Sequence, residues 1–360
     1  MGRWCEERIS ELNQLAPYRF TRFLDKSKMN AKLDANENWH IPDEKLRSIV
    51  AAAAEEVDVR KYPLDIIQEL SGAVARRLGI AEESIVPTQG ADQGIDLVCQ
   101  SFLHKGDKAV IVGPTYPFYK LRSALAGARC VSLSMNDDFS LPVEEILKVA
   151  GGGGMIFICS PNNPTGNQFQ ADDLKRLCDG FRGLVVIDEA YVDFAPWSII
   201  DEVRRRRNLL VLRTFSKAFG LAGLRLGLVI GNPEWMPTFF ERVQYPYPIS
   251  GLAANIALRL LNEYDVVEEG IASLRRERSW LSQELARFEE VEVLASVTNF
   301  FLINLARDYA KAHSQLLNKG IATRRIGRVL RWENCLRVTI GTREMNTCFL
   351  GALSEVLRNA

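Results

Sequence analysis

Short apolar runs alternate, along the middle of the chain, with segments long enough to form helices. Most of these runs are apolar throughout, with no regular alternation of apolar and polar residues. The six runs are AVIVG (109–113), RCVSLS (129–134), MIFIC (155–159), LVVID (184–188), LLVLR (209–213) and LGLVI (226–230). Strands that are covered on both faces have this pattern, and the intervening segments can form crossover helices. The sequence therefore predicts an α/β fold with a mainly parallel central sheet between helices.

The flanking segments predict a second, smaller unit. Segment 64–79 has apolar residues at helical spacing and ends in Gly79, which favours a helix with one buried face. Beyond about residue 250 the pattern changes, with helical stretches at 251–264 and 269–288 followed by three β-rich runs. A chain of 360 residues is long enough for two domains. We expect a large domain over 40–248 and a small α+β domain built from 1–39 and 249–360.

Charge and histidine content exclude several classes of function. Lys plus Arg and Asp plus Glu both number 45, so the chain has no net charge to attract a polyanion, and no nucleic-acid partner is expected. The basic run at 204–207 is interpreted as a solvated face. The three histidines, His40, His104 and His313, are scattered without metal-ligand spacing, so no metal site is predicted.

The cysteines and the hydropathy pattern indicate a cellular location. Seven cysteines without a C-x-x-C pair are typical of free thiols in a reducing cytosol. No uninterrupted apolar stretch reaches the roughly 18 residues of a membrane span, and the first residues lack the apolar region of a signal peptide. We therefore expect a cytoplasmic protein without a membrane partner.

The strongest local signal is TFSKAFGLAGLRLG, residues 214–227, directly after an apolar run. Lys217 supplies an amine that can form an imine with a carbonyl group. Ser216 and Arg225 supply hydroxyl and guanidinium donors suited to a phosphate. A lysine in a loop is by itself most often an ordinary surface residue, so this interpretation depends on the neighbouring motifs.

Two other motifs follow buried runs. Asp188 ends LVVID, at the edge of the sheet where open α/β folds bind ligands, and a carboxylate buried there needs a partner. A protonated pyridine nitrogen is such a partner, and Tyr191 could donate its phenol to an oxygen on the same ring. Asn163, in SPNNPTG (160–166), can donate to a phenolate-like oxygen. Alternatively, Asp188 caps a helix, or belongs to an ATPase, although no G-x-x-x-x-G-K-S/T motif is present.

Segment 87–102 predicts a turn followed by a helix that starts near Ala91. Backbone N–H groups at a helix N-terminus bind anions, and Gly90 would allow a phosphate to approach closely. A glycine turn alone is a weak signal. In combination with the lysine, aspartate and asparagine motifs, in this order along the chain, it becomes specific.

With these motifs the chain resembles the fold-type I aminotransferases that depend on pyridoxal phosphate, and more closely their histidinol-phosphate aminotransferase branch. The matching motifs are LAPY (15–18), LDANEN (33–38), YP (62–63), QGADQ (89–93), GPTYPFY (113–119), SPNNPTG (160–166), VVIDEAYVDF (185–194), LRTFSKAFGLAGLRLG (212–227), YPIS (247–250) and LRVTIGTRE (336–344). They cover nearly the whole chain.

The resemblance implies roles for residues at the matching positions. Lys217 would hold pyridoxal 5′-phosphate as a Schiff base and then move the proton at the substrate Cα. Asp188 would pair with the pyridinium nitrogen, and Tyr191 and Asn163 would hold the ring oxygen. Tyr116 would stack on the ring.

The resemblance also implies a phosphate site and a dimer. The residues expected to hold the cofactor phosphate are Gly90, Ala91, Asp92, Thr214, Ser216 and Arg225. Tyr62 would reach the phosphate in the neighbouring subunit, which implies a homodimer. The small-molecule partners would be a phosphorylated amino alcohol and the pair glutamate and 2-oxoglutarate.

The substrate side of the site follows from the same resemblance. Arg337 would bind a substrate carboxylate through two parallel hydrogen bonds, which a lysine cannot match. Arg324 would bind the substrate phosphate, with Tyr18 and Tyr247 beside it, and Asn36 of LDANEN would also face the substrate. Arg324 could instead belong to a solvated basic cluster.

These features predict transamination of L-histidinol phosphate with 2-oxoglutarate, a step of histidine biosynthesis. A threonine-phosphate decarboxylase or an aromatic amino-acid aminotransferase would use the same scaffold, and a non-catalytic binding module is a more remote alternative. The chain departs from the family at Trp39 and His40, where a proline and a nearby glycine are usual. This departure affects the expected wall of the substrate pocket.

Overall fold

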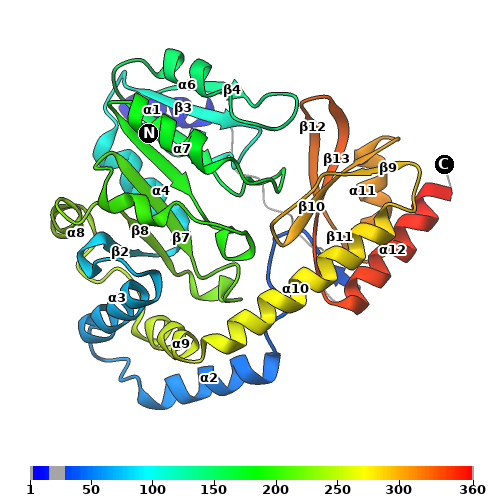
Figure 1. The fold of residues 1–360 in the computed structure, drawn as a ribbon, viewed down its shortest axis with the longest axis horizontal. Coiled ribbons are helices and arrows are strands. Elements are labelled where there is room, and N and C mark those ends of the chain that lie inside the picture. Colours follow the sequence, from blue (N-terminus) through cyan, green and yellow to red (C-terminus); the bar gives the residue numbers. More distant parts are fainter. Residues whose placement is uncertain (1–2, 16–28, 359–360) are drawn as a thin grey trace.

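The computed structural model describes residues 3–15 and 29–358, which form a seven-stranded sheet, a four-stranded sheet and a two-stranded pair, with helices around them. Figure 1 shows the larger sheet on the left and the smaller sheet on the right. Helix α10 (Tyr264–Leu285) runs along the lower side of the molecule from one sheet to the other. Within the described residues, no helix has both the length and the apolar character needed to span a membrane.

The larger sheet has seven strands in the order β2-β8-β7-β6-β5-β3-β4. The strands are β2 (Ile85–Thr88), β3 (Lys108–Gly113), β4 (Arg129–Ser134), β5 (Met155–Cys159), β6 (Leu184–Asp188), β7 (Leu209–Thr214) and β8 (Gly227–Ile230). Strands β7, β6, β5, β3 and β4 are parallel to one another. All six apolar runs form strands of this sheet, and the predicted α/β fold with a mainly parallel sheet is confirmed.

Strand β8 is antiparallel to both of its neighbours, β7 and β2. The segment between β7 and β8 contains only the short 3-10 helix η5 (Ala222–Leu224). A parallel neighbour would need a crossover of a dozen or more residues that leads back along the sheet, usually through an α-helix. This reversal leaves the Lys217 loop at the edge of the sheet where β7 ends.

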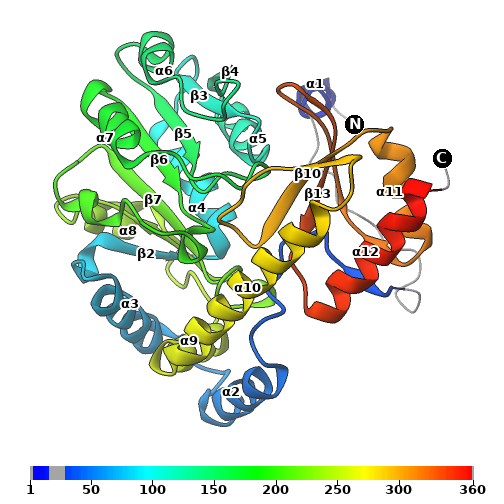
Figure 2. The same cartoon turned by 45° about the vertical axis from the view of Figure 1, so that its right-hand side comes forward.

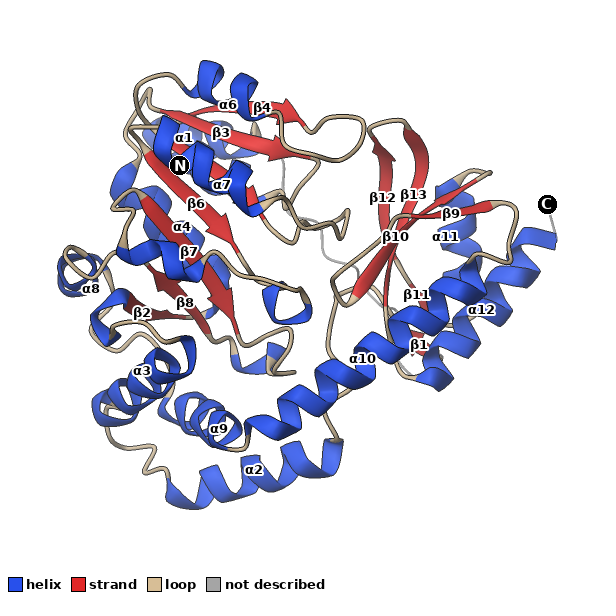
Figure 3. Ribbon diagram, in the orientation of Figure 1, coloured by secondary structure: helices blue, strands red, loops and turns tan. Residues whose placement is uncertain are grey.

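Both faces of the seven-stranded sheet are covered by helices, as Figure 3 shows. In β5, Met155 and Phe157 pack into one apolar cluster, while Ile156 and Ile158 pack into another. Successive side chains of a strand point to opposite faces, so an unbroken apolar run fills two layers of core. One face is covered by α4 (Gly90–Phe102), α5 (Phe118–Leu125) and α8 (Met236–Val243). The other face is covered by α3 (Leu64–Leu78), α6 (Val143–Ala150) and α7 (Ala171–Gly180).

Helix α3 forms where the sequence predicted it. Its apolar side chains at helical spacing, among them Ile67, Leu70 and Val74, are buried. Gly79 ends the helix with φ 65°, and its N–H bonds to carbonyls of the last turn. A residue with a Cβ would be strained in this left-handed conformation, which explains the glycine. Helix α9 (Gly251–Asn262) packs on α3 and on α2 (Asp43–Glu56).

The smaller sheet is antiparallel, with the strand order β12-β13-β10-β9. Its strands are β9 (Val291–Val293), β10 (Phe300–Leu305), β12 (Arg324–Val329) and β13 (Trp332–Thr339). Helices α11 (Tyr309–Asn318) and α12 (Arg343–Arg358) lie beside it, as Figures 1 and 2 show. Short strands β1 (Ala31–Lys32) and β11 (Ile321–Ala322) pair in parallel. Through this pair the N-terminal part of the chain joins the C-terminal part.

The remaining described elements are α1 (Arg3–Asn13), η2 (Glu82–Ser84), η3 (Val192–Phe194) and η4 (Ile200–Arg204). The change of pattern near residue 250 corresponds to the start of α9 and α10, although the second predicted helix begins earlier than expected. The division into domains of 40–248 and of 1–39 with 249–360 stays a prediction.

Candidate active site

A cavity of about 330 Å³ opens at the edge of the seven-stranded sheet, next to the smaller sheet. Strands β5, β6 and β7 contribute their last residues, Cys159, Asp188 and Thr214. The full lining is Lys32, Asp34, Ala35, Asn36, Ala91, Asp92, Tyr116, Tyr119, Cys159, Asn163, Asp188, Ala190, Tyr191, Thr214, Ser216, Lys217, Arg225, Arg324 and Arg337. Parallel strands end together at one edge, so residues far apart in the sequence converge there.

Asp188 is the most deeply placed charged group of this cavity, with 4% of its surface exposed. Its Oδ2 accepts a hydrogen bond from the hydroxyl of Tyr119 at 2.5 Å, and its Oδ1 accepts one from the backbone N–H of Ala190 at 2.9 Å. Within the described part of the chain, Asp188 forms no ion pair with a lysine or arginine. Burial raises the pKa of this carboxyl to about 6, against the lowering effect of the two hydrogen bonds. A cationic group in the cavity would restore its ionised form.

Lys217 follows β7 and lines the same cavity. Its Nζ lies 3.2 Å from two backbone carbonyl oxygens, those of Ala35 and Asn36. Loss of contact with water, and secondly the positive charge of Arg337, lower the pKa of this amine to about 8. A lysine with such a pKa is neutral in an appreciable fraction of molecules near neutral pH. The neutral amine is the form that attacks a carbonyl or takes up a proton.

Tyr191 and Asn163 present donors to the same space. The hydroxyl oxygen of Tyr191 accepts a hydrogen bond from Nδ2 of Asn36 at 3.0 Å, so the Tyr191 proton must go to another acceptor. Oδ1 of Asn163 accepts a hydrogen bond from Arg337 at 2.7 Å. Its Nδ2 group is therefore the end that can donate to a bound molecule. The guanidinium of Arg337 also donates to the backbone oxygen of Asp34, at 2.6 Å.

An anion cradle lies at the N-terminus of α4. Gly90 has φ 72°, and a Cβ there would lie 2.7 Å from a guanidinium nitrogen of Arg225. That guanidinium pairs with the carboxylate of Asp92 at 3.0 Å and donates to Ser216 at 3.3 Å. Gly227 closes the cradle, because a Cβ there would lie only 2.4 Å from the carbonyl carbon of Gly90. Backbone N–H groups, a hydroxyl and a guanidinium together fit a phosphate.

The comparison with protein families decides which family this site belongs to. The model of the family described as aminotransferase class I and II matches residues 29–353. The chain belongs to this family. The resemblance inferred from the sequence motifs is therefore confirmed, and the chain is an aminotransferase.

Individual relatives of this aminotransferase give a finer comparison. The histidinol-phosphate aminotransferase of Thermoanaerobacter sp. (strain X514) is 34% identical over 329 residues, which cover 91% of this chain and 93% of the relative. That of Parabacteroides distasonis is 33% identical over 347 residues, 95% of each chain. The crystal structure of the histidinol-phosphate aminotransferase from Sinorhizobium meliloti, in complex with pyridoxal-5′-phosphate, has a TM-score of 0.86 at 25% identity. It matches 96% of each chain.

Most of the predicted site residues of this aminotransferase line the cavity. They are Asn36, Ala91, Asp92, Tyr116, Asn163, Asp188, Tyr191, Thr214, Ser216, Lys217, Arg225, Arg324 and Arg337. Gly90 directly precedes Ala91 at the start of α4. The hydroxyl of Tyr116 donates to Asp92 at 3.0 Å, which fixes its ring at the wall of the cavity. The functional roles of these residues remain predictions.

Two predicted residues lie elsewhere, and a third is not described. Tyr62 and Tyr247 stack on each other with ring centroids 3.8 Å apart, and neither lines the cavity. They are 73% and 43% exposed. Tyr18 lies outside the described residues. Trp39 and His40, the departure from the family motif, line a neighbouring cavity of about 450 Å³.

The structure adds cavity residues that the motifs did not single out. Lys32 lies 3.3 Å from Oδ1 of Asp34 and also bonds to Glu37, so a group of alternating charges stands beside Arg324. Tyr119 donates to Asp188 from a position three residues after the predicted Tyr116. Its place within GPTYPFY was the available signal, because that motif contains two tyrosines.

Proposed function

We propose that this aminotransferase converts L-histidinol phosphate and 2-oxoglutarate to imidazole-acetol phosphate and glutamate, with pyridoxal 5′-phosphate as its cofactor. The reaction is a step of histidine biosynthesis. Relatives that are about one third identical to this chain, over more than nine tenths of its length, carry the name histidinol-phosphate aminotransferase. The observation in the structure that carries the proposal is the meeting of Asp188, Lys217, an anion cradle and two arginines in one cavity.

The donor set of the cavity fits each part of this cofactor. Asp188 is a buried carboxylate without a cationic partner in the described chain, and a protonated ring nitrogen supplies one. Tyr191 and Asn163 each have a donor left for the ring oxygen. The cradle suits the phosphate, with Ala91, Asp92, Thr214, Ser216 and Arg225 around it. The flat ring of Tyr116 provides a stacking surface.

Bound in this way, the cofactor supplies a ring that accepts the electron pair left when the substrate Cα loses its proton. Lys217 is the group that takes this proton and returns it, because its amine is the basic group in the cavity with a pKa near working pH. The ionised carboxylate of Asp188 keeps the ring nitrogen protonated. Burial would exclude water from the pair of Asp188 and the ring nitrogen and would strengthen their attraction.

Two arginines divide the recognition of the substrates. Arg337 is largely buried and offers a planar guanidinium to the carboxylate of glutamate. Arg324 is more exposed and lies among the lining residues, where its guanidinium would meet a substrate phosphate, whereas the nearby lining residue Lys32 is paired with Asp34 and Glu37. An amino alcohol phosphate needs the phosphate site at Arg324, and it has no carboxylate to bind at Arg337.

The proposal also includes a cytoplasmic homodimer in which Tyr62 reaches the cofactor phosphate of the other subunit. Tyr62 and Tyr247 stack on each other at the surface, and their chain neighbours Leu64 and Tyr245 are also exposed. Exposed large apolar and aromatic side chains that gather on one surface are typical of an interface. A location in the cytoplasm is consistent with seven free cysteines.

Single amino donors test this proposal. The cofactor-loaded protein is mixed separately with glutamate, histidinol phosphate, histidinol, phenylalanine and threonine phosphate. The change in cofactor absorbance and the release of carbon dioxide are then followed. We expect rapid conversion with glutamate and histidinol phosphate, and a much weaker response with histidinol, because histidinol lacks the phosphate.

Two other results would redirect the assignment. An equal response to phenylalanine would indicate an aromatic amino-acid aminotransferase, and carbon dioxide from threonine phosphate would indicate a decarboxylase. Replacing Lys217 by alanine should abolish turnover in each of these cases. A variant that kept full turnover would contradict the role of Lys217.

A further inference from the structure

Segment 34–38 connects the two halves of the active site. On one side, the N–H of Leu33 donates to Ala322 at 2.8 Å, next to the smaller sheet. On the other side, Nδ2 of Asn38 donates to the carbonyl of Ala218, in the Lys217 loop, at 2.8 Å. Asn36 lies between these anchors, is 1% exposed, and has φ 54°. A left-handed conformation at a buried non-glycine residue persists only where its surroundings hold it.

Asn36 touches Lys217, to which we assign the proton transfer, and Tyr191, to which we assign a hydrogen bond to the ring oxygen. Its backbone oxygen lies 3.2 Å from Nζ of Lys217. Its side-chain Nδ2 donates to the hydroxyl oxygen of Tyr191 at 3.0 Å. The conformation of this one residue therefore sets the direction of the lysine amine and of the tyrosine hydroxyl.

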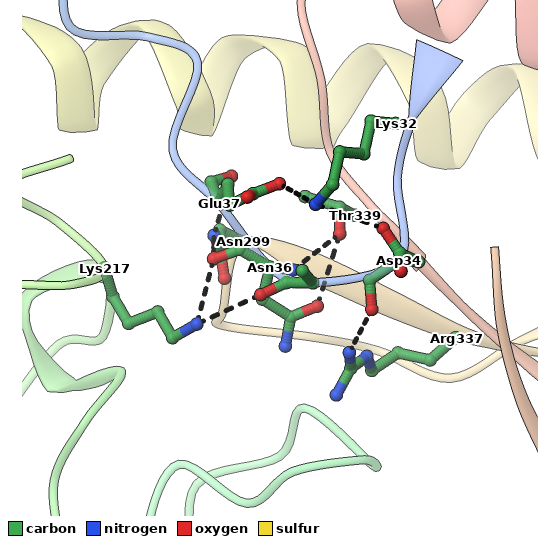
Figure 4. A network of polar contacts seen from close by, with 9 residues as sticks. Lys32, Asp34, Asn36, Glu37, Lys217, Asn299, Arg337 and Thr339 are labelled. Carbon is green, nitrogen blue, oxygen red and sulfur yellow. Dashed lines mark hydrogen bonds and ion pairs between the residues drawn. The ribbon is translucent and has the colours of Figure 1, made fainter. Parts of the chain in front are cut away.

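Two fully buried side chains from the smaller sheet hold Asn36, as Figure 4 shows. Oγ1 of Thr339, at the end of β13, accepts the backbone N–H of Asn36 at 3.0 Å and donates to its Oδ1 at 3.3 Å. Nδ2 of Asn299, just before β10, donates to the backbone oxygen of Asn36 at 3.0 Å. These bonds fix the backbone and the side chain of Asn36 together.

These bonds also fix which way each group points. Because Oδ1 of Asn36 accepts from Thr339, its Nδ2 must face Tyr191. Because the hydroxyl oxygen of Tyr191 accepts that bond, its own proton is left for an acceptor bound in the cavity that Tyr191 lines. The backbone oxygen of Asn36 has two lone pairs, and Asn299 and Lys217 occupy one each.

We propose that Thr339 and Asn299 are positioning residues for transamination, which fix Asn36 so that its carbonyl directs the Lys217 amine and its amide directs the Tyr191 hydroxyl. Neither side chain is among those that line the cavity, so both act through Asn36. The inference rests on the proposed function, because it assumes that Lys217 and Tyr191 serve a bound pyridoxal phosphate.

A set of threonine variants tests the inference. Thr339→Val removes the hydroxyl and keeps the branched shape, whereas Thr339→Ser keeps the hydroxyl. The matched control is Thr323→Val, since Thr323 is also fully buried beside the smaller sheet but its hydroxyl has no hydrogen-bond partner among the described residues. Far-UV circular dichroism and thermal melting of each variant establish that it folds.

The first readout is the pH midpoint of the absorbance change of bound pyridoxal phosphate without substrate. A donor to the ring oxygen stabilises its negative charge, so misdirecting the Tyr191 hydroxyl should raise the midpoint, by about 1 pH unit in Thr339→Val. The second readout separates kcat from KM. We expect about a tenfold loss of kcat with the KM for glutamate within about twofold of wild type, because Arg337 is untouched.

Thr339→Ser and Thr323→Val should both match wild type within about twofold, with no shift of the midpoint. The inference is overturned if Thr339→Val behaves like Thr323→Val in both readouts. If Thr339→Val does not fold, Asn299→Ala carries the same test through its effect on kcat, and an unchanged kcat in a folded Asn299→Ala overturns the inference. Failure of the proposed function would be visible earlier, as a wild-type chain that neither binds pyridoxal phosphate nor transaminates.

Discussion

Replacing Asp188 by asparagine should make the cofactor-free protein more stable near neutral pH, although it removes a group that we assign to the active site. Asp188 is buried, accepts hydrogen bonds from Tyr119 and Ala190, and forms no ion pair with a described cation. A carboxylate in this position keeps only part of its hydration energy. Asparagine has nearly the same shape and no charge.

The magnitude follows from the pKa. Burial raises the pKa of Asp188 from 3.8 to about 6, a rise of about 2 units. Each unit corresponds to about 1.4 kcal/mol, so ionisation in the folded chain costs about 3 kcal/mol. The folded state binds the Asp188 proton more tightly than the unfolded state does. This proton binding contributes its full stabilisation to the folded chain below about pH 4, and the contribution is lost as the pH rises to about 6. Asparagine loses one acceptor, which costs about 1 kcal/mol at every pH.

Urea unfolding of the cofactor-free proteins between pH 4.5 and 8 measures this effect. The variant should be about 2 kcal/mol more stable than wild type above pH 7 and no more stable near pH 4.5. Glu189 and Asp193 also have raised pKa values through burial, but both proteins contain them, so they cancel in the comparison. Asp201→Asn, at an exposed aspartate, is the control and should stay within about 0.5 kcal/mol of wild type. A constant difference between wild type and variant across this pH range would refute the reasoning.

Three further substitutions probe other parts of the site. Gly227→Ala would bring a Cβ within 2.5 Å of the Ala91 nitrogen, so we expect a loss of about 1–3 kcal/mol in unfolding free energy and at least tenfold weaker cofactor binding in fluorescence titrations. Gly223→Ala is the control: a Cβ at Gly223 would have no neighbouring atom within 4 Å, so this variant should behave as wild type. Arg337→Lys should raise the KM for glutamate about 10- to 100-fold with a smaller effect on histidinol phosphate, and equal effects on both would count against its assignment. Tyr62→Phe should weaken cofactor binding about 3- to 10-fold in a dimer, and sedimentation showing a monomer would exclude that contact.

The sequence predicted the parts of this site that depend on strand order. Asp188 and Lys217 each follow an apolar run, and parallel strands must end at the same edge, so their convergence could be inferred without coordinates. The helix expected near Ala91 could be placed in the same way, because a glycine turn follows the strand end, and it begins one residue earlier, at Gly90. The antiparallel direction of β8 depends on the path of its connection, which an apolar run does not reveal.

Contacts between distant segments could not be predicted. Tyr119 and Asp188 are 69 residues apart, and which of the two tyrosines in GPTYPFY reaches the carboxylate depends on how α5 packs on the sheet. Thr339 and Asn36 are 303 residues apart. Their pairing requires the smaller sheet to stand at one particular distance from the Lys217 loop, and neither residue type signals this in the sequence.

Burial acts on Asp188 and Lys217 in the same sense, since it drives both groups toward their neutral forms. For Lys217 the neutral form is the useful one, because only a free amine can attack a carbonyl or accept a proton. For Asp188 the proposed role needs the ionised form, and a protonated ring nitrogen would restore that form by supplying the missing positive charge. On the proposed roles, the same buried environment that favours the neutral lysine destabilises the cofactor-free site, and pairing of Asp188 with a bound cofactor would offset that cost. We infer that the low polarity at the ends of β6 and β7 serves both groups, and that cofactor affinity gains from the pairing of Asp188.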